Sequence, residues 1–327
     1  RPNSRLVPIA RTRQVTVMNT ICGVDVSKDR LDVVIGADVS GQFANDADGI
    51  ASLTELCRAH AVDLVVMEAT GGYERSAYLL LWQAGLACAV VHPASVRHYA
   101  LSMGKREKTD MIDAHIIADY AVAKRVVASQ PPSERQSRLK ALVRRLSQVS
   151  GDLGIQKQRL AMTQDDQARA SLCELIAFLK RQMRTLEGEI ASMIDDDPLW
   201  AKLAEAFSTV KAVAGRTIAR LMADFPEIGL VSNKAAAKLV GLAPLANDSG
   251  ERKGQRHIGG GRAQVRSILF LVAGLAARFD QTLRDFHRRL IDAGKPKMVA
   301  RIALAHKLLV RLNAKARDAR KDFANAP

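Results

Sequence analysis

The fold is decided by the stretch Ile21-Cys22-Gly23-Val24-Asp25-Val26, followed after a short polar turn by Leu31-Asp32-Val33-Val34-Ile35-Gly36. β-Branched and apolar residues dominate both segments, which predicts two strands joined as a hairpin. A third short strand at 41–44 would complete a meander. The remaining elements expected before residue 130 are a helix at 50–60, a strand at 64–67, a helix at 73–85, a strand at 87–91, and helices at 94–102 and 110–124. Three strands in hairpin order, followed by alternating helix and strand, predict an α/β domain with a mixed sheet.

The rest of the chain has a helical pattern after a break at Pro131-Pro132. Apolar residues recur at spacings of three and four between 134 and 207, which predicts two long amphipathic helices. These helices fold back on each other or pair with another chain, so ordinary packing and an oligomerising coiled coil are both open. We expect four parts, which are a flexible basic arm (1–17), an α/β domain (18–130), a helical coiled-coil segment (131–207) and a mostly α, basic C-terminal domain (208–327).

The charge of the chain points to a polyanionic partner. The formal net charge is +15, and residues 250–327 alone hold 18 Lys and Arg against 6 Asp and Glu. Such clustering favours nucleic acid, although a solvated basic surface would look the same in composition. Aromatic residues make up only 4% of the chain, which argues against recognition by base stacking. The nucleic acid is therefore expected to be bound through its backbone and shape.

Other classes of protein are disfavoured by composition. No apolar run approaches the ~20 residues that a membrane-spanning helix needs, so no membrane role is expected. The four cysteines form no CxxC pair, which argues against a zinc site and indicates buried thiols in a reducing compartment. We therefore expect a cytoplasmic protein.

Four acidic residues are placed to converge. Asp25 lies within an apolar strand, where a carboxylate is costly unless it is paired or bound to a metal. Glu68 ends the next apolar strand, and Asp110 and Asp113 share one face of a predicted helix that continues through Ile117. Oxygen-only ligands suit Mg²⁺ or Mn²⁺, and such ions stabilise phosphodiester transfer. The sequence therefore predicts a metal site made by these four carboxylates.

Each of these acids also has an ordinary structural interpretation. Asp25 could accept hydrogen bonds at a bulge, and Glu68 could cap the helix that follows it. Asp110 lies near a helix N-terminus, where acids are favoured, and Asp113 could pair with a basic residue. Four unrelated structural roles are less expected than one shared site.

At these residues the chain resembles the DEDD transposases of insertion sequences, which are bridge-RNA-guided recombinases. The segments that carry the resemblance are 23–28 (GVDVSK), 67–73 (MEATGGY), 108–114 (KTDMIDA), 241–250 (GLAPLANDSG), 258–266 (IGGGRAQVR), 294–297 (GKPK) and 307–309 (KLL). The resemblance implies a RuvC-like, RNase H-type N-terminal domain. It places the DEDD tetrad on Asp25, Glu68, Asp110 and Asp113.

The same resemblance implies a role for Ser249. In the family, the serine of the Ser-Gly pair is a nucleophile that becomes covalently joined to DNA. Taken alone, Asp-Ser-Gly is a common turn, and a serine hydroxyl is a weak nucleophile unless it is activated. The carboxylate-bound metal could supply that activation if the two domains meet, which in the family occurs between protomers.

Basic residues near these motifs are candidate phosphate ligands, because charge-assisted hydrogen bonds to phosphate position a protein on nucleic acid. The candidates are Lys105, Arg106, Lys108, Arg252, Lys253, Arg256, Arg262, Arg266, Lys295 and Lys297. Solubilising charge is the ordinary alternative. The glycine run at 259–261 suits close approach of the backbone to a phosphate.

We therefore expect a transposase or recombinase of an insertion sequence, which cleaves and rejoins DNA with Mg²⁺ or Mn²⁺ through a serine–DNA intermediate. Its expected partners are donor and target double-stranded DNA, a noncoding guide RNA, and further copies of itself in a dimer or tetramer. It would work in the cytoplasm at the nucleoid. Two alternatives are a RuvC-like junction endonuclease with water as nucleophile, and a non-catalytic nucleic-acid-binding protein.

Overall fold

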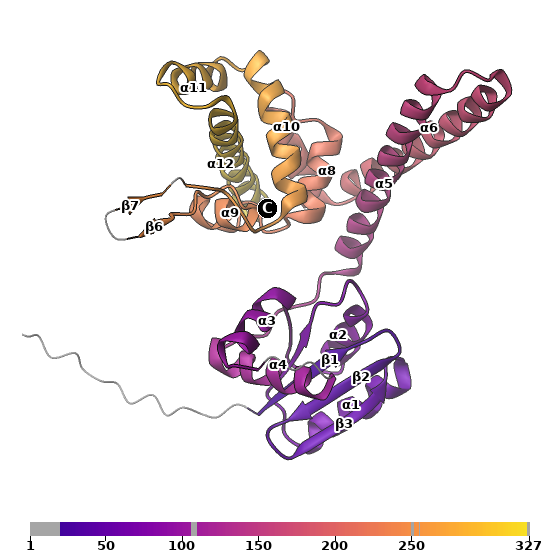
Figure 1. Cartoon of the computed structure of the whole chain (residues 1–327), viewed down its shortest axis with the longest axis vertical. Coiled ribbons are helices and arrows are strands. Elements are labelled where there is room, and N and C mark those ends of the chain that lie inside the picture. Colours follow the sequence, from indigo (N-terminus) through magenta and orange to yellow (C-terminus); the bar gives the residue numbers. More distant parts are fainter. Residues whose placement is uncertain (1–19, 106–109, 250–251, 255, 326–327) are drawn as a thin grey trace, which may run out of the picture. The chain divides into compact units, whose positions relative to one another are not determined.

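The computed structural model describes residues 20–325 except 106–109, 250–251 and 255. The expected basic arm at 1–17, and the candidates Arg106 and Lys108, lie outside the described residues. The chain divides into two compact units, one ending at Pro132 and one beginning at Ser133. Figure 1 labels helices and strands of both units. None of the helices described is long and apolar enough to cross a membrane.

The first unit contains a mixed five-stranded sheet in the order β3-β2-β1-β4-β5. Its strands are β1 (Ile21–Val26), β2 (Arg30–Ile35), β3 (Val39–Ala44), β4 (Leu64–Glu68) and β5 (Cys88–Val91). Strand β1 pairs antiparallel with β2 and parallel with β4, and β4 is parallel to β5. This order and these directions are those of the RNase H-like fold, so the predicted α/β class is confirmed.

Four helices cover the two faces of this sheet. They are α1 (Ala47–Ala59), α2 (Glu74–Gln83), α3 (Pro93–Ser102) and α4 (Asp110–Lys124). Alternate residues of β1 point to opposite faces. Val24 therefore packs with Leu53 of α1 and Leu81 of α2, whereas Ile21 packs in a separate core with Ile117 of α4.

The cysteines of the first unit are core residues. Cys22, Cys57 and Cys88 are buried in the core beneath α1 and α2, as expected. Burial raises the pKa of Cys88 to about 12, so its thiol stays protonated. Cys173, in the second unit, is exposed instead, because it lies on the solvent face of its helix.

The second unit is mostly helical. Its elements are α5 (Glu134–Met162), α6 (Asp166–Asp195), α7 (Pro198–Ser208), α8 (Gly215–Asp224), α9 (Asn233–Val240), β6 (Asp248–Ser249), β7 (Arg252–Lys253), α10 (Ala263–Phe279), α11 (Gln281–Asp292) and α12 (Lys297–Ala324). Helices α5 and α6 fold back on each other through Leu146 and Met183. The same core continues to Leu308 of α12. The division of this region at residue 207 stays a prediction, because both parts share one core.

The glycine run in this unit serves contact between two segments of the protein. Gly261 has φ +62°, and a Cβ there would lie 2.5 Å from Gly241 N and from Leu239 O. The amide of Arg262 donates to Leu239 O at 2.8 Å. In this structure the close backbone approach expected for a phosphate is made with the C-terminus of α9.

Candidate active site

Asp25 and Glu68 lie at the ends of neighbouring parallel strands. In the register of β1 and β4, Val24 is opposite Met67, so Asp25 and Glu68 are each the next residue along. Both point to the sheet face that carries Ile21 and Leu64, because side chains alternate along a strand. Both are half-buried. Two carboxylates from separate parts of the sequence therefore share one edge and one face of the sheet.

Helix α4 brings Asp113 to the same face. Its Ala114 and Ala118 pack against Gly23 of β1, so closely that a Cβ on Gly23 would overlap Ala114 O and lie 2.9 Å from Ala118 N. Asp113 directly precedes Ala114 and is half-buried. Gly23 is two residues before Asp25 on the same strand face, so the glycine contact places this turn of α4 over the strand face that carries Asp25.

Gly23→Ala is expected to lower both stability and activity. The added methyl meets backbone atoms of α4, which cannot move without shifting the helix, so a loss of roughly 2–3 kcal/mol in unfolding free energy is expected. Denaturant unfolding of the full chain measures it. The matched control is Gly151→Ala in α5, where no atom lies within 4 Å of the added carbon. Equal stability of wild type and Gly23→Ala would contradict the close helix–strand contact.

Asp110 is the first residue of α4, but its side chain lies outside the described residues. Among the side chains that are described, no group of three His, Cys, Asp or Glu is arranged to hold a metal ion. The oxygen donors on β1, β4 and α4 are of the kind that Mg²⁺ or Mn²⁺ prefers. The donor chemistry fits a divalent ion, and β1, β4 and α4 place the backbone positions of Asp25, Glu68 and Asp113 on one side of the sheet.

Glu74 organises the loop that follows Glu68 at the end of β4. One carboxylate oxygen of Glu74, Oε2, accepts hydrogen bonds from Gly72 N at 2.9 Å and from Thr70 N and Oγ1, both at 3.1 Å. Burial raises the pKa of Glu74, but these hydrogen bonds and one from its own amide outweigh burial and hold the pKa below its ordinary value. Sequence reasoning missed Glu74, although an acid in the first turn of a helix after Thr-Gly-Gly is a capping signal.

A buried carboxylate that sequence reasoning also missed lies opposite Asp25. Asp32 of β2 is paired in register with Asp25 and is only 2% exposed. Its two oxygens accept from Arg30 Nε at 2.9 Å and from Gln42 Nε2 at 2.8 Å. An acid between Leu31 and Val33 was the available signal. Asp32 therefore lies beside Asp25 on the neighbouring strand and is held by two hydrogen-bond donors of its own.

Asn45 ties together the turns that follow the two strand acids. Its Nδ2 donates to the carbonyl oxygen of Ser27 at 2.9 Å and to that of Tyr73 at 3.2 Å. Ser27 follows β1, and Tyr73 lies at the end of the Glu68 loop. The side chain thus holds the turn after β1 against the loop after β4.

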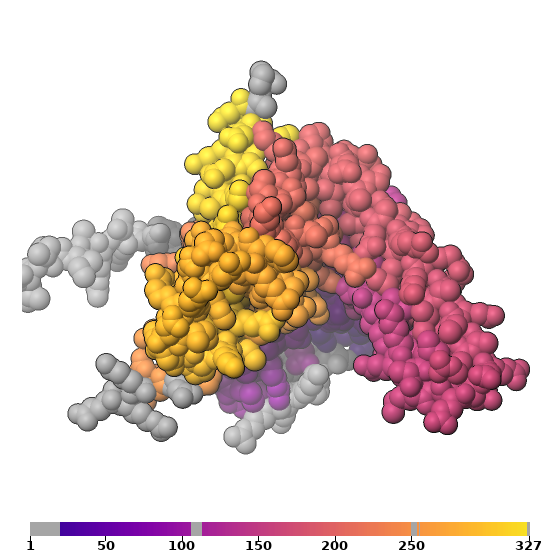
Figure 2. All heavy atoms as spheres, turned by 90° about the horizontal axis from the view of Figure 1, so that it is seen from above, coloured from indigo at the N-terminus to yellow at the C-terminus, as the bar shows by residue number. Residues whose placement is uncertain are grey.

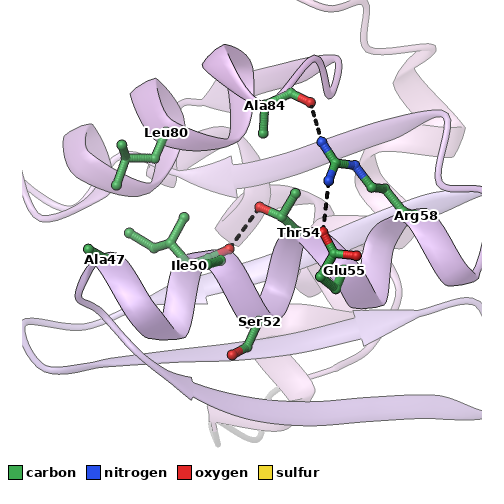
Figure 3. Close-up of a pocket in the computed structure, with 9 residues that line it drawn as sticks. Ala47, Ile50, Ser52, Thr54, Glu55, Arg58, Leu80 and Ala84 are labelled. Atoms are coloured by element: carbon green, nitrogen blue, oxygen red, sulfur yellow. Dashed lines mark hydrogen bonds and ion pairs between the residues drawn. The ribbon is translucent and has the colours of Figure 1, made fainter.

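A hollow of about 500 Å³ between α1 and α2 lies on the other face of the sheet (Figure 3). Arg58 there donates to Glu55 Oε1 at 2.7 Å and to Ala84 O at 2.9 Å, and Thr54 Oγ1 donates to Ile50 O. The polar groups of this hollow are therefore satisfied within the protein. Because α1 and α2 cover the face opposite to the acids, the hollow is separate from the carboxylate site.

Ser249 lies in a short hairpin of the second unit. Strand β6 pairs with β7 so that Ser249 is opposite Arg252 and Asp248 is opposite Lys253. Ser249 is exposed, and within the described part of the chain no hydrogen bond occupies its hydroxyl. The hairpin therefore presents a hydroxyl to solvent next to two basic positions, whose side chains lie outside the described atoms.

Comparison with known proteins identifies the family. Residues 22–167 match the family model for DEDD transposases of the IS110 type, and residues 204–288 match the transposase model of the IS116/IS110/IS902 family. The two matches follow each other in chain order and together span well over half of the chain. The chain belongs to the IS110-type DEDD transposases. It is thus an enzyme of DNA transposition and recombination.

Relatives of the transposase extend over nearly its whole length. It is 27% identical over 303 residues to the pilin gene-inverting protein of Moraxella bovis, with 89% of this chain and 93% of that protein covered. The pilin gene-inverting protein of Moraxella lacunata is 26% identical over the same lengths. T. thermophilus RuvC in complex with a Holliday junction substrate is 13% identical, with a TM-score of 0.27 and coverage of 34% of this chain and 98% of RuvC.

The candidate phosphate ligands of the transposase differ in their surroundings. Lys295, Lys297 and Arg256 are exposed, and Lys105 pairs with Asp119 at 3.3 Å on the surface of the first unit. Two further candidates make internal contacts in the second unit. Arg266 donates to Gly260 O at 2.6 Å.

Arg262 makes a two-pronged ion pair with Glu227, with both N···O distances at 2.5 Å, and it stacks over Phe225 at 5.4 Å. Burial raises the pKa of Glu227, but the hydrogen bonds and the charge of Arg262 outweigh burial and hold the pKa below its ordinary value. The guanidinium of Arg262 therefore anchors the glycine run to the segment before α9.

Glu227→Gln is expected to lower the melting temperature at neutral pH but not in acid. Because the folded-state pKa of Glu227 is lowered, its contribution is complete above the unfolded pKa of about 4.3 and is lost as the pH falls through the folded pKa. The melting temperatures of variant and wild type should therefore converge once the pH lies below the folded-state pKa of Glu227. A pH-independent difference would show that the ion pair is not the cause.

Proposed function

We propose that this transposase cuts and rejoins the DNA of an insertion sequence, with a divalent ion held by Asp25, Glu68, Asp110 and Asp113 and with Ser249 as nucleophile. One observation carries the proposal. Asp25 and Glu68 end neighbouring parallel strands on one face of the sheet, and the close contact at Gly23 brings the start of α4 to that face. Acids converging on one strand edge suit phosphodiester transfer.

The proposed chemistry is a balanced exchange of phosphoester bonds. The Ser249 oxygen attacks the scissile phosphorus, its proton passes to solvent, and the bond from phosphorus to a deoxyribose oxygen breaks. That oxygen leaves as a hydroxyl after it takes up a proton. A hydroxyl of the partner strand then reverses the step and releases the serine. The number of phosphoester bonds is conserved, so no external energy source is needed, and Mg²⁺ or Mn²⁺ supplies charge stabilisation at the phosphate.

The partners follow from the same proposal. Donor and target DNA are bound through phosphate contacts of the exposed basic residues, and a noncoding guide RNA selects the sites. The carboxylates lie in one unit and Ser249 in the other, so we propose that a complete site forms when the units of two copies meet on DNA at the nucleoid. The relatives named for inverting a pilin gene support a recombination activity.

The test is an assay of purified full-length protein with duplex DNA that carries the element's ends. Cleaved and rejoined products are expected with Mg²⁺ or Mn²⁺ and not with EDTA. RNA that co-purifies from cells carrying the element is sequenced in parallel. A single abundant RNA from the element's flank supports the guided model, and a random mixture argues against it. Cleavage of branched DNA with no rejoining would instead identify a junction nuclease.

A further inference from the structure

Helices α10, α11 and α12 lie together in the second unit (Figure 1), and their side chains line a cationic groove. Its volume is about 410 Å³, which is in the range of ligand-binding pockets. It is lined by Leu271, Gly274, Leu275, Ala277, Arg278, Arg284, His287, Arg301 and Leu304. The lining thus combines three arginines and a histidine with leucine side chains and contains no carboxylate.

Arg301 is held in place on the floor of this groove. Its guanidinium stacks on Phe270 at 4.2 Å, and Nε donates to Phe270 O at 3.4 Å. A Cβ on Gly274 would lie 3.1 Å from Arg301 Nη2, so the glycine makes room for the charged group against α10. A glycine within a helix costs stability, and here it provides the space in which the guanidinium lies.

Arg284, a second arginine of the groove, is also oriented by neutral partners. Arg284 donates from Nε to Ala277 O at 3.2 Å, from Nη1 to Gln281 Oε1 at 3.0 Å, and from Nη2 to Arg278 O. None of the three guanidinium groups is paired with an acid among the residues that the structure describes. Oriented positive charge with no internal counter-ion is suited to an external anion.

Apolar side chains border these charges. Leu271 and Leu275 of α10 line the groove and are 56% and 46% exposed, and the neighbouring Phe279 is 66% exposed. In the space-filling view, the light orange atoms of this part of the chain face the viewer (Figure 2). A ligand that fits must offer an anion to the arginines and an apolar surface to the leucines.

We propose that this groove binds an unpaired nucleotide of a single-stranded nucleic acid, with its phosphate on Arg301 and Arg278 and its base or sugar on Leu271 and Leu275. In a duplex the bases are stacked inside, so only an unpaired nucleotide offers both surfaces at once. This inference rests on the proposed function, in which the transposase handles nucleic-acid strands, and it adds a site outside the carboxylates and the serine hairpin.

The test is fluorescence anisotropy of full-length protein with a labelled single strand, as RNA and as DNA of the same sequence, and with the matching duplex. Arg301→Gln removes the oriented charge, and Gly274→Leu fills the groove with no change of charge. Each is expected to weaken single-strand binding about tenfold. For Arg301→Gln, the slope of log binding constant against log salt concentration should also become shallower by about 0.7, because one phosphate contact is lost.

The matched controls are Arg181→Gln and Gly188→Leu on α6, because Arg181 is exposed and nothing lies within 4 Å of a Cβ at Gly188. Arg278→Gln, at an exposed position, serves if Gly274→Leu unfolds. A loss of affinity for only the RNA strand, or for only the DNA strand, identifies which nucleic acid the groove binds. The proposal is overturned if the variants lose no more single-strand affinity than the controls do. It is also overturned if they lose affinity only for the duplex. Anisotropy measures binding and does not depend on catalysis. A failure of the proposed function would be seen separately, as absence of DNA cleavage by the wild-type protein.

Discussion

Asp25→Asn is expected to lower strand cleavage by at least about a thousandfold, because the substitution removes one negative charge from the centre of the proposed ion site with almost no change of shape. The effect is large since Asp25 lies between β2 and β4 and next to the contact with α4. The measurement is the single-turnover rate of cleavage of labelled DNA in saturating Mg²⁺.

Two controls separate this loss from unfolding or lost binding. Asp38→Asn changes the same chemical group at an exposed turn after β2 and should cleave at the wild-type rate. DNA affinity of Asp25→Asn should stay near that of wild type, because phosphate binding is assigned to basic residues. Cleavage by Asp25→Asn within tenfold of wild type would remove Asp25 from the mechanism.

Ser249→Ala is expected to lower the yield of rejoined product by at least about a thousandfold. The variant lacks the hydroxyl that would join covalently to the cut DNA strand. DNA binding and the melting temperature should be unchanged, since Ser249 is exposed and lies in a two-residue strand. Recombinant junctions are counted by sequencing after incubation with both DNA partners.

The control for this variant is Ser171→Ala, which removes a hydroxyl from an exposed position on α6 and should recombine normally. Ser249→Cys keeps a nucleophile in place and should form a protein–DNA adduct slowly. If Ser249→Ala still cleaves at the wild-type rate and only rejoining is lost, water is the nucleophile and a nuclease mechanism replaces the proposed one.

Local patterns were sufficient to predict the elements of the first unit. The alternation in 21–26 and 31–36 predicted a hairpin, and the helix expected at 110–124 is observed with the same bounds. The acids at strand ends predicted convergence, because parallel neighbours end at one edge. Family resemblance added the RNase H-like fold, which the strand order confirms.

Long-range contacts could not be predicted in this way. The pairing of Arg262 with Glu227 joins residues 35 positions apart, and nothing in either local segment indicates it. The space that Gly23 leaves for Ala114 depends on where α4 crosses the sheet. Asp32 was missed for a different reason, since its position opposite Asp25 follows only once the hairpin register is known.

The most direct test of the central claim is Mn²⁺ binding to the full-length protein, measured by electron paramagnetic resonance on wild type, Asp25→Asn, Asp113→Asn and the Asp38→Asn control. If strand β1 and helix α4 hold one ion, both site variants lose Mn²⁺ affinity by at least about tenfold. Asp38→Asn should bind as wild type does. Unchanged Mn²⁺ binding in Asp25→Asn and Asp113→Asn would contradict the claim that these carboxylates form a shared metal site.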